Sequence, residues 1–238
     1  RMLKKTDGPP ITPEEAKRKA AKFLNIADTS SMQVVENGTD TDFTTYSVNV
    51  PVQNKASIQL EYTKAGGKLV YFLSSEDVKA TKISVDQAVE AGRAFLEKNE
   101  YGPMRAISFD SYNHVASIIF ARVVNGVTIY PEKVTVRVSM EDAKVLGLSA
   151  GDMLQTGITE KVDEPVLTLE EVRKNLNPEF KEQDVSLAVI LNDLEETVLC
   201  YEFLGQINGG TYRIYFNAEN GFEEKIERIR QADAEASK

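Results

Sequence analysis

The chain has 238 residues and a formal net charge of −9 at neutral pH, with 42% hydrophobic and 27% charged residues. These values are typical of an ordinary globular protein, and the negative charge argues against nucleic-acid binding, which depends on cations that neutralise phosphates. The single cysteine, Cys200, excludes an internal disulfide bond, and no apolar run approaches the length of a membrane-spanning helix.

Residues 1–10 are predicted to form a linker, which closes at Pro9-Pro10. The first residues lack the pattern of a signal peptide. The internal Met2 and the linker-like start are typical of a piece of a longer protein, so we expect an anchor or a signal upstream.

One helix start occurs three times along the chain. In each copy a hydroxyl residue is followed three positions later by Glu or Gln, and apolar residues flank the pair, as in a capping box with a hydrophobic staple. The copies are Ile11-Thr12-Pro13-Glu14-Glu15-Ala16, Ile83-Ser84-Val85-Asp86-Gln87-Ala88 and Leu167-Thr168-Leu169-Glu170-Glu171-Val172. The first two align without a gap as far as Phe23-Leu24 and Phe95-Leu96. Such self-similarity indicates a repeated structural unit.

Strand patterns follow each helix start. The helices are predicted from Pro13 to about Asn25, from Val85 to about Asn99, and from Leu169 to about Asn175. Residues 57–62 and 133–138 alternate with the period of half-buried strands, and Gly66-Gly67, Asn125-Gly126 and Asn208-Gly209 are typical of hairpin turns. Each unit therefore reads as one helix packed on about four antiparallel strands, with local connections and no parallel crossover.

These patterns predict an α+β fold of three tandem units. The expected boundaries are residues 11–79, 80–160 and 161–230, followed by a polar, frayed tail at 231–238. Residues 1–160 hold 19 basic and 20 acidic residues, whereas residues 161–238 hold 9 and 17. The third unit thus carries nearly all the net charge, either as a solvated surface or as an acidic face that steers a basic partner.

The sequence predicts no catalytic residue, no metal site and no cofactor site. His114 is the only histidine, and its position beside Asn113 is typical of an exposed turn rather than of a catalytic triad. Cys200 lies in an apolar run and is expected to be a buried small hydrophobe. The acids of Asn37-Gly38-Thr39-Asp40-Thr41-Asp42 hint at calcium, but the glycine comes too early for an EF-hand loop, so we interpret this stretch as a turn.

Tyr130-Pro131 interrupts a predicted strand. Proline cannot donate to a sheet ladder, so the pair indicates an edge or a bulge. Either it is a simple strand entry, or Tyr130 and Pro131 are weak candidates for a partner-binding edge with Tyr130 as an exposed anchor.

The order of helix, strands and closing turn resembles the PepSY domain family. Glu14-Glu15-Ala16 and Asp86-Gln87-Ala88 match its early helix pattern, and Asn217-Ala218-Glu219-Asn220-Gly221 matches its turn. Met140-Glu141-Asp142-Ala143-Lys144 departs from this pattern because it has no glycine. Three such units, together with the Tyr130-Pro131 segment, resemble the C-terminal region of the YpeB family of spore germination proteins over about residues 8–230.

This resemblance implies a non-enzymatic accessory protein of spore germination. It implies an extracytoplasmic place in the spore, at the outer face of the inner membrane or in the cortex, and a cortex-lytic peptidoglycan hydrolase of the SleB type as the partner that the protein stabilises or restrains. PepSY domains also occur in protease propeptides, so a protease regulator is the first alternative, and direct binding to peptidoglycan is the second.

Overall fold

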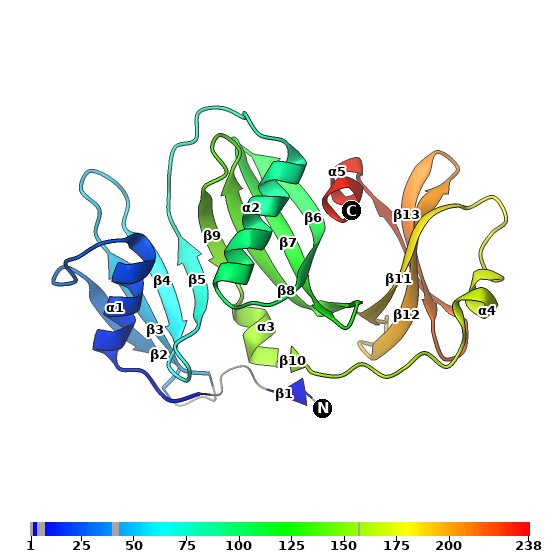
Figure 1. Cartoon of the computed structure of the whole chain (residues 1–238), viewed down its shortest axis with the longest axis horizontal. Helices are drawn as coiled ribbons and strands as arrows, with labels where there is room; N and C mark the ends of the chain where they lie inside the picture. The colour runs from blue at the N-terminus through cyan, green and yellow to red at the C-terminus, as the bar shows by residue number, and fades with distance from the viewer. Residues whose placement is uncertain (1, 4–7, 40–42, 157) are drawn as a thin grey trace.

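The computed structural model describes residues 2–3, 8–39, 43–156 and 158–238. Figure 1 shows helix-and-sheet units that follow one another along the longest axis of the molecule. We call them the N-terminal, middle and C-terminal units.

Each unit begins with a helix and continues with four antiparallel strands. The N-terminal unit consists of α1 (Pro13–Leu24), β2 (Gln33–Asn37), β3 (Thr45–Val50), β4 (Ile58–Thr63) and β5 (Leu69–Leu73). The middle unit consists of α2 (Val85–Lys98), β6 (Met104–Tyr112), β7 (Val115–Val124), β8 (Val127–Ser139) and β9 (Val145–Ser149), and is followed by α3 (Gly151–Thr156). The C-terminal unit consists of α4 (Leu169–Arg173), β11 (Lys181–Leu191), β12 (Thr197–Ile207), β13 (Gly210–Asn217) and β14 (Glu223–Ile229).

The strands of the three units join into one twelve-stranded sheet. Its order is β14-β13-β12-β11-β8-β9-β5-β4-β3-β2, with β7 beside β8 and β6 beside β7. β5 pairs with β9 in antiparallel fashion, but β11 pairs with β8 in parallel at Ala188–Thr128 and Val189–Ile129. The strand pairings within each unit are antiparallel, as expected, but the parallel pairing that joins the middle and C-terminal units was not anticipated.

The same turn closes all three units. In each, the first residue donates its backbone N–H to the carbonyl of the sixth at 2.8 Å, and the fifth has a positive φ. The turns are residues 63–68, 139–144 and 217–222, with Gly67, Ala143 and Gly221 at the fifth position. The middle turn thus keeps the geometry although alanine replaces glycine, at an unfavourable φ of 65°.

Each turn also holds the start of its own helix. The residue before each N-cap donates its backbone N–H to the second residue of the turn: Ile11 to Lys64, Ile83 to Met140 and Leu167 to Ala218, at 2.8, 3.0 and 2.8 Å. The three helix starts found in the sequence therefore occupy equivalent positions in three-dimensional structure.

The predicted helix caps form, with one difference. Ser84 with Gln87 and Thr168 with Glu171 make complete capping boxes. At the first helix the hydroxyl of Thr12 accepts the backbone N–H of Glu15, as expected. The carboxylate of Glu15, however, accepts from the hydroxyl of Thr12 at 3.2 Å and not from the backbone N–H of Thr12. α4 ends at Arg173, two residues before the predicted end, because the backbone turns at Asn175 and Leu176 before Pro178.

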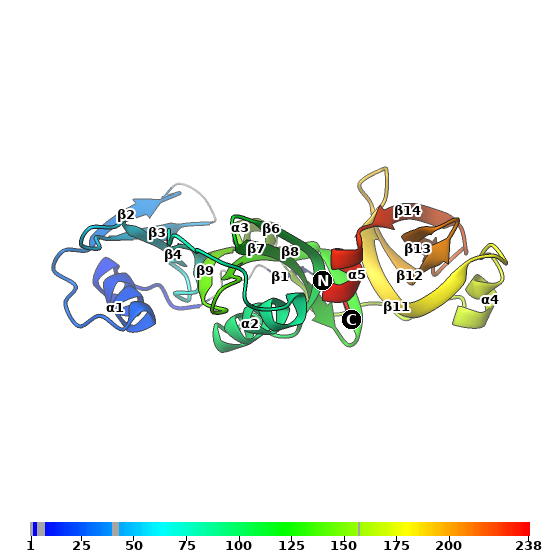
Figure 2. The ribbon, with the colours of Figure 1, turned by 90° about the horizontal axis from the view of Figure 1, so that it is seen from above.

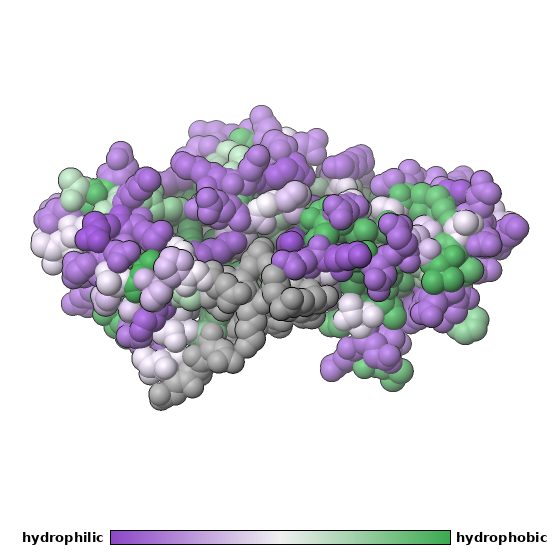
Figure 3. Space-filling model, turned by 60° about the horizontal axis from the view of Figure 1, so that its bottom comes forward, coloured by the Kyte–Doolittle hydropathy of each residue, from purple (hydrophilic) through white to green (hydrophobic). Residues whose placement is uncertain are grey.

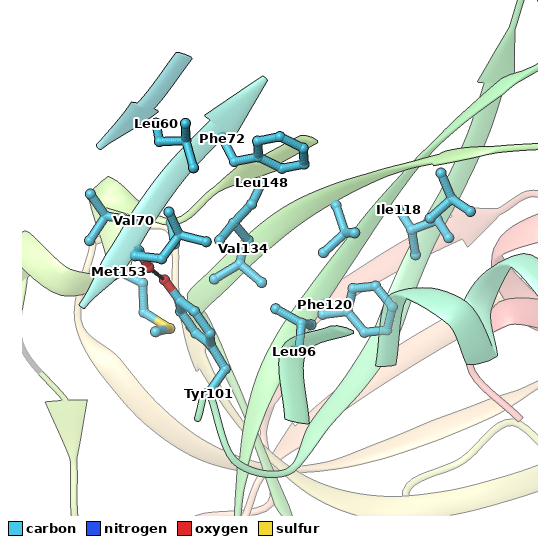
Figure 4. Packing of buried hydrophobic residues seen from close by; sticks show 14 of the residues in the cluster. Leu60, Val70, Phe72, Leu96, Tyr101, Ile118, Phe120, Val134, Leu148 and Met153 are labelled. Carbon is cyan, nitrogen blue, oxygen red and sulfur yellow. Dashed lines mark hydrogen bonds between the residues drawn. The ribbon is translucent and has the colours of Figure 1, made fainter. Parts of the chain in front are cut away.

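The N-terminal and middle units share one core. α1 and α2 lie on the same side of the joined sheet (Figure 2), where Phe23 and Phe95, which are equivalent residues of the two helices, both contact Phe72 of β5. Figure 4 shows Phe72 and Leu60 packed near Leu148 of the middle unit, while the hydroxyl of Tyr101 bonds to the carbonyl of Leu69. The C-terminal unit has a separate cluster around Val172, Phe203 and Phe216.

The two ends of the chain differ from the prediction. Within the expected linker, β1 (Met2–Leu3) pairs with β10 (Ile158–Thr159), and Pro10 bridges to Ala65. The frayed tail predicted at 231–238 is wrong: residues Gln231–Ala236 form helix α5, which buries Ala234 and Ala236 and packs on β6 and α2 of the middle unit. The alanines of α5 are small enough to pack closely against these elements. The helix was not predicted because the segment is otherwise polar.

Candidate functional site at the junction of the middle and C-terminal units

A buried carboxylate, Glu202 of β12, organises the junction between the middle and C-terminal units. Its side chain is 1% exposed, and Arg105 of β6 donates to its Oε2 at 2.8 Å. Tyr130 of β8 and Tyr215 of β13 donate to Oε1, the latter at 2.9 Å, and Ser186 of β11 donates to Oε2 at 3.4 Å. Five strands from two units therefore meet at one side chain.

A bulge in β8 brings Tyr130 to this position. Arg122 of β7 pairs with Ile129 and Ala121 pairs with Lys133, so residues 130–132 have no partners on β7. At the other edge of β8, pairing with β11 at 128–129 gives way to pairing with β9 from Thr135. The sheet thus divides at Pro131, which cannot donate to either neighbour.

Charge at this site is balanced inside the protein. Burial acts to raise the pKa of Glu202, but Arg105, the hydroxyl of Tyr130 and the nearby Arg213 outweigh it and hold that pKa below the usual range of a glutamate. Burial and the negative charge of Glu202 raise the pKa of Tyr130 and of Tyr215. The carboxylate is therefore ionised and both phenols are neutral at ordinary pH.

Helix α5 adds a second set of contacts across the same junction. Arg230 and Asp233 form an ion pair at 3.1 Å and bond the exposed edge of β6: Phe109 donates its N–H to Asp233 Oδ1 at 2.8 Å, and its carbonyl accepts from Arg230 at 2.8 Å. Arg213 donates twice to the carbonyl of Ile107. These side chains satisfy backbone groups that a neighbouring strand would otherwise bond.

Tyr130 is not an exposed anchor. Its hydroxyl bonds Glu202, and its ring packs edge-on against Tyr215 with the centroids 5.8 Å apart. The bulge expected from Pro131 is present. Whether Tyr130 and Pro131 contribute to binding a partner stays a prediction.

The remaining sequence candidates lie apart from one another. His114 is an exposed residue of the turn between β6 and β7, and its Nδ1 lies 2.8 Å from the hydroxyl of Thr81. Cys200 is buried among Ala188, Ile190 and Tyr215, and burial raises the pKa of its thiol to about 12. A thiol so hard to ionise is a poor nucleophile, which agrees with the predicted structural role. Of the stretch 37–42, residues 40–42 lie outside the described part of the chain.

The arrangement holds two units in a fixed relation; it does not expose reactive groups to a substrate. Across the described ranges, no group of three His, Cys, Asp or Glu side chains is placed to hold a metal ion. In the same ranges, no helix is long and apolar enough to cross a membrane.

Sequence reasoning missed Glu202 and Arg105. The available signal was a single acidic residue inside the apolar run Val198-Leu199-Cys200-Tyr201-Glu202-Phe203, since a charge in such a strand is rarely buried without a partner. The partner itself lies 97 residues earlier and carries no local signature.

The chain is similar in sequence to proteins described as sporulation proteins. The family described as YpeB sporulation, PepSY1 and PepSY2 domains, matches residues 1–162. Sporulation protein YpeB of Bacillus subtilis is 34% identical over 229 residues, and that of Halalkalibacterium halodurans is 32% identical over 233. The matches cover 95% and 98% of this chain but 51% and 52% of those proteins, so the chain spans about half their length.

A solved structure of the Bacillus megaterium YpeB C-terminal domain has the same fold. It is 33% identical, superposes with a TM-score of 0.85, and the match covers 94% of this chain and 100% of that one. The resemblance to the YpeB family is therefore confirmed.

Proposed function

Because the chain belongs to the YpeB family of sporulation proteins, we propose that it is a non-enzymatic accessory protein of spore germination that binds a cortex-lytic peptidoglycan hydrolase. In this proposal the partner is a hydrolase of the SleB type, and the bound chain stabilises or restrains it. The complex forms outside the cytoplasm, at the outer face of the inner membrane or in the cortex. The family match is the observation that carries the proposal.

The use of polar groups in the chain supports a binding role. The buried acid Glu202 is fully engaged with Arg105 and two tyrosines, and the thiol of Cys200 is buried. Groups so occupied fix the shape of a rigid scaffold, whereas catalysis needs accessible groups of tuned pKa. An elongated chain of joined units offers a large surface to a protein partner instead.

The proposal includes PepSY character for all three units. The family model covers the first two of them, and the third repeats their link between helix start and closing turn, with Leu167 bonded to Ala218 as Ile11 is to Lys64. On this basis we assign residues 161–230 to the same type of unit as residues 11–79 and 80–160.

Hydrolase stability tests the function directly. The purified hydrolase is heated with and without an equimolar amount of the chain, and its residual lytic activity on cortex peptidoglycan is measured, with lysozyme-free serum albumin as the control protein. We expect the chain to lengthen the half-life of the enzyme or to lower its initial rate. An enzyme unchanged in both rate and half-life contradicts the proposal.

The PepSY match also favours a second candidate, a propeptide-like regulator of metalloproteases. Inhibition of a panel of metalloproteases at micromolar chain concentration would favour that reading. An unaffected panel excludes it.

A further inference from the structure

Exposed apolar side chains gather at one end of the C-terminal unit. Among the described residues eight large hydrophobic side chains are exposed, and five of them belong to this unit or its entry segment: Val166, Leu191, Leu194, Phe222 and Ile226. Leu194 is 76% exposed and Phe222 is 71% exposed. Hydrophobic residues are visible among hydrophilic ones on this lobe of the molecule in Figure 3.

The segments that carry them are held together by backbone hydrogen bonds. Ala218, in the turn between β13 and β14, donates to the carbonyl of Leu199 of β12 and accepts from Leu167. β12 in turn begins at the turn formed by residues 192–196, where Asn192 bonds Glu196. Asp193 and Ile226 line one shallow groove of about 340 Å³ with Glu223, Glu224 and Lys225. The turns at 192–196 and 217–222 are therefore neighbours.

This end is also strongly acidic. Exposed carboxylates lie on the same segments as the apolar side chains, namely Asp193, Glu195, Glu196, Glu219 and Glu223. The segments 191–197 and 217–226 contain a single basic residue, Lys225. We call the five apolar and five acidic residues the acidic end.

The core of the C-terminal unit and its main contacts with the middle unit are made by residues outside the acidic end. The core of the C-terminal unit lies around Phe203 and Phe216, and its contacts with the middle unit run through Glu202, Arg213 and α5. Large apolar residues left exposed together, inside a charged rim, are the usual composition of a protein-binding surface. The negative charge of the acidic end favours a positively charged partner and rejects anionic polymers.

We propose that the acidic end is a docking surface for a basic protein face that presents apolar side chains between its cations. This inference rests on the proposed function, under which the occupant is the peptidoglycan hydrolase. An enzyme that works on an anionic polymer gains from a cationic surface, and such a surface would be covered, and held away from the polymer, when it sits on the acidic end.

Paired variants test the surface. The hydrolase is immobilised, and retention of the complete chain is measured at 50 and 300 mM salt. One variant, Leu194→Ser/Phe222→Ser, removes apolar contacts, and its matched control is Val35→Ser/Tyr112→Ser, at exposed apolar positions of the other two units. A second variant, Asp193→Lys/Glu196→Lys, reverses charge, and its control is Asp77→Lys/Glu97→Lys, at exposed acids elsewhere.

We expect both acidic-end variants to bind at least tenfold more weakly than the wild type, and the controls to bind within twofold of it. The wild type should also lose affinity at the higher salt, because exposed charges are screened. Circular dichroism checks that every variant keeps its fold. If the wild type binds and all four variants bind equally, the docking surface is overturned while the proposed function stands. If the wild type itself does not bind, the proposed function fails and the assignment of this surface fails with it.

Discussion

The hydroxyl of Tyr130 in the middle unit donates a hydrogen bond to the buried carboxylate of Glu202 in the C-terminal unit. The two residues lie 72 positions apart in the sequence and on strands that do not pair with each other. Together with the bonds from Arg105 and Tyr215, this contact holds the middle and C-terminal units in a fixed relation where the sheet divides at Pro131.

Removing this hydroxyl should weaken the joint. Tyr130→Phe leaves the apolar packing on Tyr215 in place but takes one donor from a buried carboxylate, and we expect a loss of about 1–3 kcal/mol in the free energy of unfolding. Chemical unfolding followed by circular dichroism measures it. Tyr112→Phe, at an exposed tyrosine, is the matched control and should change stability by less than about 0.5 kcal/mol. Equal stability of the two variants would show that the bond contributes nothing.

The stabilisation from Glu202 should depend on pH. Its pKa is lower in the folded state than in the unfolded chain, so its contribution is complete above the unfolded value, near pH 4.3, and is lost as the pH falls through the folded value. At pH 7, Glu202→Gln should cost about 3–5 kcal/mol, because Arg105 remains buried without its counter-charge.

The difference in stability between wild type and Glu202→Gln should therefore stay level from pH 7 to about pH 5 and shrink as the pH falls further to about 3.5. Glu97→Gln, on the exposed side of α2, is the control and should differ little from the wild type throughout. A gap between wild type and Glu202→Gln that stays constant over this range would mean that Glu202 is not ionised at neutral pH.

The closing turns give a reciprocal pair of substitutions. Ala143 has a left-handed φ of 65° where the C-terminal unit has Gly221 at 77°. We expect Ala143→Gly to stabilise the chain by up to about 1 kcal/mol, since relief of the left-handed strain outweighs the extra entropy of glycine. Gly221→Ala should destabilise it by at least as much, because its new methyl group would also meet Asn175 Nδ2 at 3.0 Å. Melting temperatures that shift in the same direction for both variants would contradict this account of the turn.

Helix α5 should protect the edge of β6. In Asp233→Ala the N–H of Phe109 loses its acceptor, so we expect hydrogen exchange at that amide to be at least tenfold faster. Hydrogen–deuterium exchange resolved to the β6 peptide measures this, with Gln231→Ala, at an exposed position of the same helix, as the control. Unchanged protection of Phe109 would show that α5 does not seal this edge.

Local features of the fold could be predicted because their signals are local. The caps at Ser84 and Thr168 and the hairpin turn at Asn125-Gly126, where both residues have positive φ, depend on residues a few positions apart. The starts of α2 and α4 followed directly from these caps.

The joints between units could not be predicted, because they depend on contacts distant in sequence. The residues around β8 carry no local pattern that predicts the parallel pairing of Thr128 with Ala188. The residues around Glu202 likewise give no indication that its partner is Arg105. α5 was missed for a related reason: its alanines and Asp233 matter only because β6 presents Phe109 to them. The candidate site is made of such contacts, so the sequence supplied Tyr130 and Pro131 but assigned them to an exposed edge.

The binding constant of the purified chain for the purified cortex-lytic hydrolase tests the central claim most directly. Isothermal titration calorimetry at physiological salt should give a dissociation constant in the micromolar range or below, with a stoichiometry near one. No heat of binding at concentrations of about 100 μM would contradict the account, because a chain that does not bind the hydrolase cannot stabilise or restrain it.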